Sequence, residues 1–176
     1  MEDRIRNIFI TGRPGVGKTT AIMRTVEQLG REARGFYTEE MREGRRRVGF
    51  RISDLQANSA VMAHVDFSRE ISVGKYGVDV EAVDRIGVAA LQEAISRGVL
   101  AVVDEVGKME LASDDFVRIL EEALDAGIPV IGTVHNKQEK HARRLKERLD
   151  TDVWRITMDN RDEIPARLAR AVSALP

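Results

Sequence analysis

The sequence contains no cysteine, which excludes disulfide bonds, thiolate metal sites and cysteine nucleophiles and is consistent with a reducing compartment. Aromatic residues make up only 5% of it, so single-stranded nucleic acid would find few side chains to stack on. No stretch reaches the roughly 18 apolar residues of a membrane-spanning helix, and the charged N-terminus does not resemble a signal peptide. We therefore expect a soluble, cytoplasmic protein.

A strong net charge of either sign is also lacking. The 28 basic residues nearly balance the 29 acidic ones, giving a net charge of -1, which argues against a surface dedicated to nucleic acid. The 176 residues are 43% hydrophobic and 32% charged, enough for a folded core beneath a highly charged surface. These values predict a single domain over residues 1–176 without a linker or internal repeat, and we expect a monomer.

Strands and helices alternate along most of the sequence. Short apolar or β-branched runs predict strands, and apolar residues recurring every three or four positions predict helices that end at glycines. Strands are predicted over 5–11, 35–41, 47–55, 99–103, 128–134 and 153–157, and helices over 18–29, 79–97, 114–126, 137–149 and 160–174. This alternation predicts a three-layer α/β fold, with a mostly parallel central sheet and a β-hairpin insertion near residues 35–55. The topology of residues 60–76 is left open.

A glycine-rich loop between the first strand and the first helix carries the strongest motif. Gly12–Thr19 reads G-R-P-G-V-G-K-T and matches the phosphate-binding pattern G-x-x-x-x-G-K-[ST] at every fixed position. The glycines let the loop curl around a polyphosphate with its backbone N–H groups pointing inward, at the positive end of the helix dipole. Lys18 is expected to reach the β and γ phosphates, and the hydroxyl of Thr19 to ligate Mg²⁺.

Two acidic residues follow the apolar strand at 99–103. Ligands of open α/β sheets bind at the carboxyl ends of the strands, so Asp104 is expected to hold Mg²⁺ through a water molecule. Glu105 is the candidate base that orients and deprotonates the water attacking the γ phosphate. The predicted catalytic residues are therefore Lys18 and Glu105, and the predicted metal ligands are Thr19 and Asp104.

Two further motifs raise the alternative of a GTPase. Asp104–Gly107 also reads D-x-x-G, and Asn136–Glu139 differs by one methylene group from N-K-x-D, so both resemble guanine-nucleotide-binding signatures. In a GTPase a complete strand and helix would separate the two motif-bearing strands, whereas here the strand at 128–134 comes next. This order argues against a GTPase. Thr133, near the end of that strand, is a candidate sensor of the γ phosphate or an ordinary strand threonine.

Basic side chains gather on the predicted helix 137–149 and at the hairpin tip. They are Lys137, Lys140, Arg143, Arg144, Lys146 and Arg148 on the helix, and Arg42, Arg45, Arg46 and Arg47 on the hairpin. Each cluster could bind nucleic acid or substrate phosphate, but a solvated surface partly paired with Glu139 and Glu147 is the simpler interpretation. On the same helix, Leu145 and Leu149 are expected to face inward. Asn160 and Arg161 either approach the base or ribose or cap the last helix, and capping is favoured.

Several segments together resemble one family. Besides Gly12–Thr19, the hairpin segments 35–39 and 47–52, the run V-D-E-V-G-K-M-E-L at 103–111 and N-R-D at 160–162 are similar to the thermophile-type nucleoside-triphosphatases, whose vertebrate member is called the cancer-related nucleoside-triphosphatase. The resemblance covers nearly the whole chain. It implies a RecA-like P-loop fold and hydrolysis of ATP, GTP, CTP, UTP and TTP to diphosphate and phosphate with little base preference. The nucleotide-contacting residues that follow from the motif and the resemblance are Gly12, Arg13, Pro14, Gly15, Val16, Gly17, Lys18, Thr19, Thr20, Asp104, Glu105 and Gly107.

Two functions other than hydrolysis stay open at the level of sequence. A P-loop kinase would pass the phosphate to a small molecule or a polynucleotide end, with Glu105 activating the acceptor hydroxyl. A nucleotide-dependent switch would grip RNA or a protein with its basic helix or hairpin and hydrolyse slowly. The lack of an arginine-rich lid disfavours the kinase, and the near-neutral net charge disfavours the nucleic-acid switch. A Mg²⁺-dependent nucleoside-triphosphate phosphohydrolase is the first hypothesis.

Overall fold

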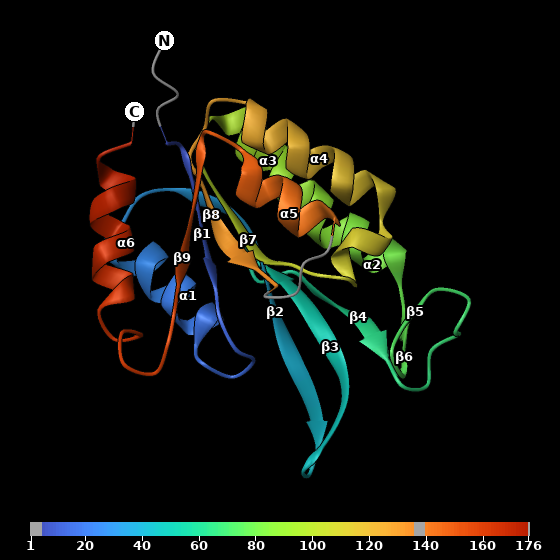
Figure 1. Cartoon of the computed structure of the whole chain (residues 1–176). Coiled ribbons are helices and arrows are strands. Elements are labelled where there is room, and N and C mark those ends of the chain that lie inside the picture. The colour runs from blue at the N-terminus through green and yellow to red at the C-terminus, as the bar shows by residue number, and fades with distance from the viewer. Residues whose placement is uncertain (1–4, 136–139, 176) are drawn as a thin grey trace.

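The computed structural model describes residues 5–135 and 140–175, whose strands join in one sheet. Within these residues nine strands follow the order β5-β6-β4-β3-β2-β7-β8-β1-β9 (Figure 1). The strands are β1 (Asn7–Thr11), β2 (Ala33–Glu43), β3 (Arg46–Asp54), β4 (Ser59–His64), β5 (Ser72–Val73), β6 (Tyr76–Val78), β7 (Leu100–Val106), β8 (Val130–Val134) and β9 (Thr151–Arg155). The helices are α1 (Lys18–Leu29), α2 (Val80–Val83), α3 (Ala89–Arg97), α4 (Asp114–Asp125), α5 (Lys140–Glu147) and α6 (Ile164–Ser173). None of the described helices is long and apolar enough to cross a membrane.

The sheet is mixed, with a parallel half and an antiparallel half. The strands β2, β7, β8, β1 and β9 run parallel to one another. Beyond β2, the strands β3, β4, β6 and β5 extend the sheet by antiparallel pairing. The predicted hairpin is present as β2 and β3, and it belongs to the main sheet because β2 also pairs with β7. The predicted parallel sheet thus corresponds to one half of the observed sheet. Residues 60–76, whose topology the sequence left open, contribute to β4, β5 and β6 in the antiparallel half.

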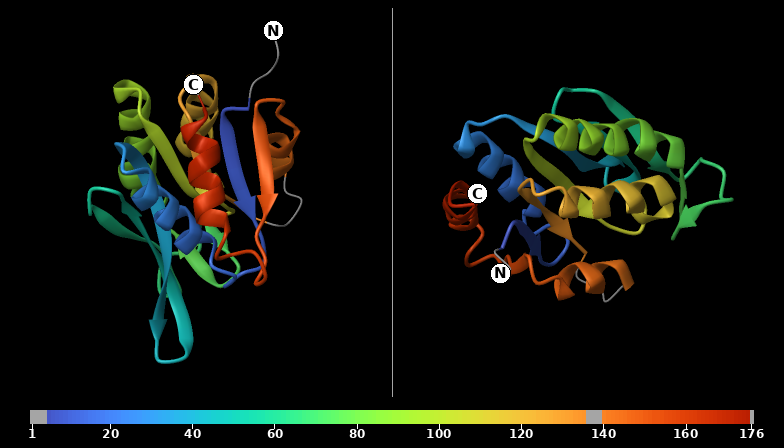
Figure 2. Two further views of the ribbon diagram at one scale, coloured as in Figure 1. Left: turned by 90° about the vertical axis from the view of Figure 1, so that its left-hand side faces the viewer. Right: turned by 90° about the horizontal axis from the view of Figure 1, so that it is seen from above.

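Helices cover both faces of the parallel half (Figures 1 and 2). The helices α1 and α6 pack together on one face, α3 and α4 cover the other, and α5 packs beside the edge strand β9. Successive residues of β1 enter opposite layers, because side chains alternate along a strand. Ile8 and Ile10 join the apolar cluster of α1 and α6, whereas Phe9 joins that of α3 and α4. Both faces are therefore buried, as the uninterrupted apolar runs predict.

The order β7-β8-β1 determines where the site forms. Along the chain β8 is the next strand after β7, and in space it lies between β7 and β1. This is the arrangement that argued against a GTPase in the sequence. Because the three strands are parallel, their carboxyl ends meet at one edge of the sheet, next to the loop that follows β1. The start of β1 and the end of α6 lie at the opposite edge (Figure 1).

The helix predicted over 79–97 forms, but its middle turn is wider than that of an α-helix. The side chain of Asp79 begins it by accepting a hydrogen bond of 3.1 Å from the backbone N–H of Ala82. A π-helical turn over Asp84–Val88 then joins α2 to α3. The wider turn brings three consecutive residues, Ile86, Gly87 and Val88, into the core. Regular helical periodicity does not predict this local widening.

Two predictions near the end of the chain are wrong. Leu149 is 75% exposed instead of inward, because α5 ends at Glu147 and helical periodicity no longer applies beyond it. Asn160 does not cap the last helix, because Pro165 lies in the first turn of α6 and fixes its start at Ile164. The predicted start of the basic helix and the N-K-Q-E segment, residues 136–139, lie outside the described residues.

Candidate active site

The phosphate loop, Gly12–Thr19, connects the end of β1 to the start of α1. Gly15 and Gly17 have φ angles of +75° and +104°, in the left-handed region that glycine adopts without strain. The helix α1, all of whose residues are described, has no side-chain cap and no acidic residue in its first turn. Its first N–H groups are therefore left for an external acceptor, and the helix dipole favours an anion there. The loop has the conformation and the charge of a phosphate-binding site.

Lys18 ties the two ends of the phosphate loop together. Its ammonium group donates hydrogen bonds of 3.3 Å to the carbonyl oxygen of Gly12 and 3.4 Å to that of Arg13. An ammonium group has three donors, so Lys18 can contact a phosphate as well as the loop. Its position at the first residue of α1 places this positive charge where the helix dipole already attracts anions.

Asp104 is buried where β7 lies beside β8, with only 2% of its surface exposed. The hydroxyl of Thr133 on β8 donates a hydrogen bond of 2.5 Å to Oδ1 of Asp104. The other oxygen, Oδ2, has no hydrogen-bond partner among the described residues. Burial raises the pKa of Asp104 to about 6, against the opposing effect of hydrogen bonds from Thr133 and Thr19. A buried carboxylate with an unsatisfied oxygen is stabilised by a cation.

The hydroxyl of Thr19 and the carboxylate of Asp104 fit a magnesium ion. The hydroxyl of Thr19 is close enough to the Asp104 carboxylate to lower its pKa, so oxygen atoms from α1 and β7 meet beside the partnerless Oδ2. In residues 5–135 and 140–175, no group of three or more His, Cys, Asp or Glu side chains is arranged to hold a metal. Mg²⁺ commonly binds one or two carboxylates and completes its shell with phosphate oxygens and water. This sparse donor set therefore suits an ion that arrives with a nucleotide.

Glu105 and Glu110 lie on either side of Gly107. A Cβ at Gly107 would stand 3.2 Å from Oε1 of Glu105 and 2.9 Å from Oε2 of Glu110, so the glycine leaves room for both carboxyl groups. Glu105 is partly exposed to the cleft, whereas Glu110 is 3% exposed. Burial, and to a smaller extent the charge of Glu105, raises the pKa of Glu110 to about 8. Glu110 therefore keeps its proton at neutral pH and adds no negative charge beside Glu105.

A cleft of about 830 Å³ brings most of the predicted site residues together. Its size is within the range of pockets that bury a small-molecule ligand. From the predicted set it is lined by Gly12, Pro14, Gly15, Gly17, Lys18, Thr19, Thr20, Asp104, Glu105 and Gly107. Side chains of the hairpin and of β6 line the side away from the phosphate loop, among them Thr38, Glu39, Glu40, Arg47, Phe50 and Tyr76. The cleft therefore extends from the phosphate loop, past the two acidic residues, to the antiparallel half of the sheet.

The two remaining predicted residues, Arg13 and Val16, line an adjoining groove of about 380 Å³. One side of this groove is the first part of the phosphate loop, and the other is the segment 155–159 at and after the end of β9. Pro14 and Gly15 line both the cleft and the groove. All the predicted nucleotide-contacting residues thus lie in two depressions that share the phosphate loop.

Three parts of the site are absent from the sequence prediction. Glu110 belongs to the run that resembles the family, but nothing in the pattern indicates that its carboxyl group is buried beside Glu105. The sequence predicts the hairpin itself, but it does not predict that side chains of the hairpin line the cleft. The segment 155–159 mostly follows a strand, where side-chain periodicity gives no signal. Thr133, the candidate sensor, lies against Asp104, one residue before the end of β8.

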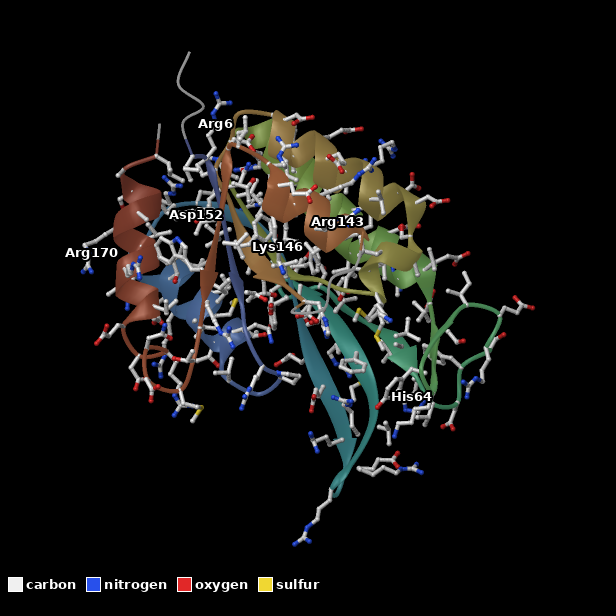
Figure 3. The ribbon with its side chains drawn as sticks, viewed as in Figure 1. Arg6, His64, Arg143, Lys146, Asp152 and Arg170 are labelled. Atoms are coloured by element: carbon white, nitrogen blue, oxygen red, sulfur yellow. The ribbon has the colours of Figure 1, made fainter. Side chains whose placement is uncertain are left out.

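The basic clusters are at least partly paired with acidic side chains, as the simpler interpretation expected. At the hairpin, Arg42 and Arg47 each lie 2.6 Å from the carboxylate of Glu40. On α5, Arg143, which is labelled in Figure 3, lies 3.7 Å from the carboxylate of Glu147. Exposed pairs of this kind contribute little to stability. Their effect is to reduce the positive charge that each cluster presents.

Comparisons with known proteins give one consistent set of similarities. A family model described as NTPase matches residues 7–169. The nucleoside-triphosphatase THEP1 of Thermofilum pendens is 39% identical over 176 residues, covering 97% of each chain, and that of Natranaerobius thermophilus is 42% identical over 171 residues, covering 94% of this chain and 96% of the relative. The crystal structure of THEP1 from Aquifex aeolicus matches with a TM-score of 0.85 at 31% identity, over 94% of this chain and 98% of that one. The solution structure of a human cancer-related nucleoside triphosphatase matches with a TM-score of 0.83 at 33% identity, over 97% and 99%.

Proposed function

The chain belongs to the NTPase family, and from this membership we propose that it hydrolyses nucleoside triphosphates to the diphosphate and inorganic phosphate with Mg²⁺ as cofactor. The observation that carries the proposal is the convergence of the phosphate loop, Asp104 and Glu105 on one cleft. Relatives that are named nucleoside-triphosphatases support the same activity. We assign the activity to a single domain over residues 1–176, and a cytoplasmic monomer stays a prediction from the sequence.

Binding of the triphosphate is assigned to the phosphate loop. The N–H groups at the start of α1 and the ammonium group of Lys18 neutralise the β and γ phosphates. Thr19 and Asp104 would hold Mg²⁺, which when bound withdraws charge from the phosphate oxygens. Thr133 keeps the Asp104 carboxylate in one orientation through its hydrogen bond. The buried Oδ2 of Asp104, which lacks a partner in the described chain, supports this assignment.

Glu105 is proposed as the base for the attacking water. Its carboxylate accepts a proton from the water as the water oxygen forms a bond to the γ phosphorus. The bond from that phosphorus to the bridging oxygen breaks, and its electron pair stays on the diphosphate. Gly107 keeps the space beside Glu105 free of a side chain, so the carboxylate remains open to the cleft. The neighbouring carboxyl of Glu110 is protonated at neutral pH and does not add repulsion.

We extend the proposal to ATP, GTP, CTP, UTP and TTP as substrates. The residues that converge in the cleft address phosphates and a metal ion, which all five nucleotides share. The experiment is to measure phosphate release from each nucleotide, with and without Mg²⁺, for the wild type and for Lys18→Ala and Glu105→Gln. Release should require Mg²⁺ and fall roughly 100-fold or more in both variants.

Matched control variants remove the same chemical groups elsewhere. Lys146→Ala and Glu27→Gln alter exposed residues of α5 and of the later part of α1, so both should keep the wild-type rate. Full activity in Glu105→Gln would remove Glu105 from the role of base. Phosphate transfer only in the presence of an added acceptor, or hydrolysis only with added RNA, would favour the kinase or the switch instead.

A further inference from the structure

The hairpin side of the cleft contains an arginine that the proposed function does not use. Among the described residues that line the cleft, Arg47 is the only arginine. It lies on β3, in the antiparallel half of the sheet, whereas the phosphate loop follows β1 in the parallel half (Figure 1). A guanidinium group presents several N–H donors in one plane and is well suited to bind a phosphate group through two of them. The cleft therefore has a second group with the chemistry for phosphate, away from the phosphate loop.

Three neighbouring side chains hold the guanidinium group of Arg47 in place. Its Nε donates a hydrogen bond of 3.0 Å to the hydroxyl of Tyr76 on β6, and one terminal nitrogen donates a bond of 2.6 Å to the carboxylate of Glu40 on β2. The guanidinium carbon lies 5.1 Å from the centre of the Phe50 ring and 5.9 Å from that of Tyr76. These two rings pack edge to face, with 5.2 Å between their centres. A group that is already oriented loses less conformational entropy when it binds a ligand.

Donors and positive charge remain at Arg47 for a ligand. The bonds to Tyr76 and Glu40 use two of its five N–H donors, and its side chain is 40% exposed. Glu40 also accepts bonds of 3.1 and 2.6 Å from Arg42, so two guanidinium groups share one carboxylate and the three side chains together are positive. The hydroxyl of Thr38 supplies a further donor, because Thr38 lines the cleft on the same face of β2 as Glu40. These features favour an anion with several acceptor oxygens.

The phosphate produced by hydrolysis needs a route away from the γ position. In the proposed function this phosphate forms next to Asp104 and Glu105 while the diphosphate still occupies the phosphate loop. The negative charge of the diphosphate repels a phosphate ion in this position. The cleft continues past the two acidic residues to the hairpin and Arg47. Glu39 and Lys108, which also line the cleft, carry opposite charges that offset each other, so the positive charge at Arg47 attracts the departing ion.

We propose that Arg47 and Thr38 form a subsite that binds inorganic phosphate after hydrolysis, as the ion leaves the active site through the hairpin side of the cleft. The inference rests on the proposed function, because its ligand is the product of that reaction. Binding is non-covalent, through paired N–H donors of the guanidinium group to two phosphate oxygens. Glu40 and Tyr76 are positioning residues, which orient the guanidinium group without touching the phosphate. The subsite and the phosphate loop can be occupied at the same time.

The test measures phosphate binding while the phosphate loop is filled. Sodium phosphate is titrated calorimetrically, at constant ionic strength, into protein saturated with Mg²⁺ and the β,γ-imido analogue of ATP, which occupies the γ position. We expect phosphate to bind to the wild type, and its affinity to fall roughly tenfold or more in Arg47→Gln because a charge-assisted pair is lost. Tyr76→Phe keeps the ring and the charge of Arg47 but removes the hydroxyl that orients it. The affinity should then fall less, by roughly threefold.

Arg46→Gln is the matched control variant. Arg46 is exposed, lies 3.6 Å from the carboxylate of Glu43, and is not among the described residues that line the cleft. Because Arg46 and Arg47 are neighbours on β3, their side chains point to opposite faces of the strand. Arg46→Gln should therefore bind phosphate as the wild type does. Circular dichroism checks that each variant keeps the wild-type fold.

Turnover gives an independent measurement. Phosphate at the subsite blocks the exit of the next product ion without displacing the substrate, so added phosphate should lower kcat in the wild type and in Arg46→Gln. In Arg47→Gln the same phosphate concentrations should leave kcat unchanged and raise only KM, by competition at the phosphate loop.

Equal phosphate affinity in the wild type and Arg47→Gln, binding only when the phosphate loop is empty, or no binding to the wild type would each overturn the inference. Methyl phosphate, a monoester, is titrated in parallel. If it binds more tightly than inorganic phosphate, the subsite belongs to a second phosphorylated molecule, and the assignment to the product is wrong. The binding test requires no hydrolysis. A wild type that binds phosphate through Arg47 but releases none from nucleoside triphosphates would therefore contradict the proposed function alone.

Discussion

The hydroxyl of Thr133 and Oδ1 of Asp104 lie 2.5 Å apart, joining β8 to β7 at the edge of the sheet where the phosphate loop begins. This hydrogen bond satisfies one oxygen of a buried carboxylate and leaves Oδ2 for a partner outside the described residues. It depends on the strand order, because a threonine on β8 reaches Asp104 only when β8 lies beside β7. The strand between the phosphate loop and the acidic residues thus orients the proposed metal ligand.

Replacing Thr133 by valine should weaken the response to Mg²⁺. The valine has nearly the same shape but no hydroxyl, so Asp104 loses a hydrogen bond that lowers its pKa and fixes its orientation. We expect the Mg²⁺ concentration for half-maximal phosphate release to rise roughly tenfold or more, with activity restored at high Mg²⁺. Thr133→Ser keeps the donor and should behave as the wild type. An unchanged Mg²⁺ titration in Thr133→Val would show that the hydrogen bond has no part in metal binding.

Replacing Asp104 by asparagine should abolish activity and stabilise the metal-free protein. Burial raises the pKa of Asp104 from its ordinary value of 3.8 to about 6, so between these values the folded protein holds a proton that the unfolded chain releases. The free energy of unfolding therefore falls as pH rises through this window, and the loss is complete above about pH 6. An amide has no charge to desolvate, so Asp104→Asn should be about 1–3 kcal/mol more stable at pH 7.5.

The measurement for Asp104→Asn is urea unfolding of both proteins without nucleotide or metal. Near pH 3.5 the wild-type carboxyl is protonated in the folded state and mostly protonated in the unfolded chain, so the two proteins should differ much less. A variant that is less stable than the wild type at pH 7.5 would mean that Asp104 contributes to the fold as a charged group. A variant that is more stable but inactive would instead show that the buried carboxylate is needed for activity and lowers the stability of the metal-free protein.

Replacing Gly107 by alanine should reduce turnover without unfolding the protein. The added methyl group would stand 3.2 Å from Oε1 of Glu105 and 2.9 Å from Oε2 of Glu110, so at least one carboxyl group has to move. Displacement of the proposed base should lower kcat roughly 10- to 100-fold, while the phosphate loop and KM stay nearly unchanged. Steady-state kinetics and circular dichroism together check this. A normal kcat would show that the position of the Glu105 carboxylate is not critical.

The phosphate loop and the acidic pair could be predicted because the residues that define their chemistry lie close together in short segments of the sequence. The spacing within Gly12–Thr19 requires no knowledge of distant contacts, and parallel strands bring Asp104 to the same edge of the sheet whatever the loops do. The apolar run before Asp104 likewise indicates a strand buried on both faces, and β7 is buried in this way. These features agree between sequence and structure because local pattern and sheet topology impose the same arrangement.

The rest depends on contacts between segments that are far apart in the sequence. Met158 becomes part of a groove only because Ile156 packs against the phosphate loop, more than 140 residues earlier in the chain. The burial of Glu110 depends on how its short turn packs beneath Gly107, which no periodicity reveals. Asn160 was assigned to a helix cap from a local pattern, but Pro165 moves the start of the helix and frees its side chain to hold the loop. In each case contacts between distant segments select one of several structures that the local sequence allows equally well.

Glu110 should make the stability of the protein fall with rising pH, and Glu110→Gln should remove that dependence. Burial raises the pKa of this carboxyl from 4.5 to about 8, so between these values the folded state binds a proton that the unfolded chain has lost. Unfolding then becomes easier as pH rises, by up to about 1.4 kcal/mol per pH unit for one proton. Glutamine keeps the shape of the side chain and an oxygen beside the backbone of Gly107 and Glu110, whose effect is to lower the pKa of the carboxyl.

Urea unfolding between pH 6.5 and 8 separates this effect from that of Asp104, whose pKa lies lower. All other titratable groups are common to the wild type and Glu110→Gln, so the difference between their slopes belongs to Glu110. The wild type should lose stability across the interval more steeply than Glu110→Gln, and the exposed control Glu27→Gln should follow the wild type. Equal slopes would mean that Glu110 is already ionised at neutral pH. The base proposed here would then have a second negative charge beside it, and the pH dependence of kcat would report the two carboxylates as a coupled pair.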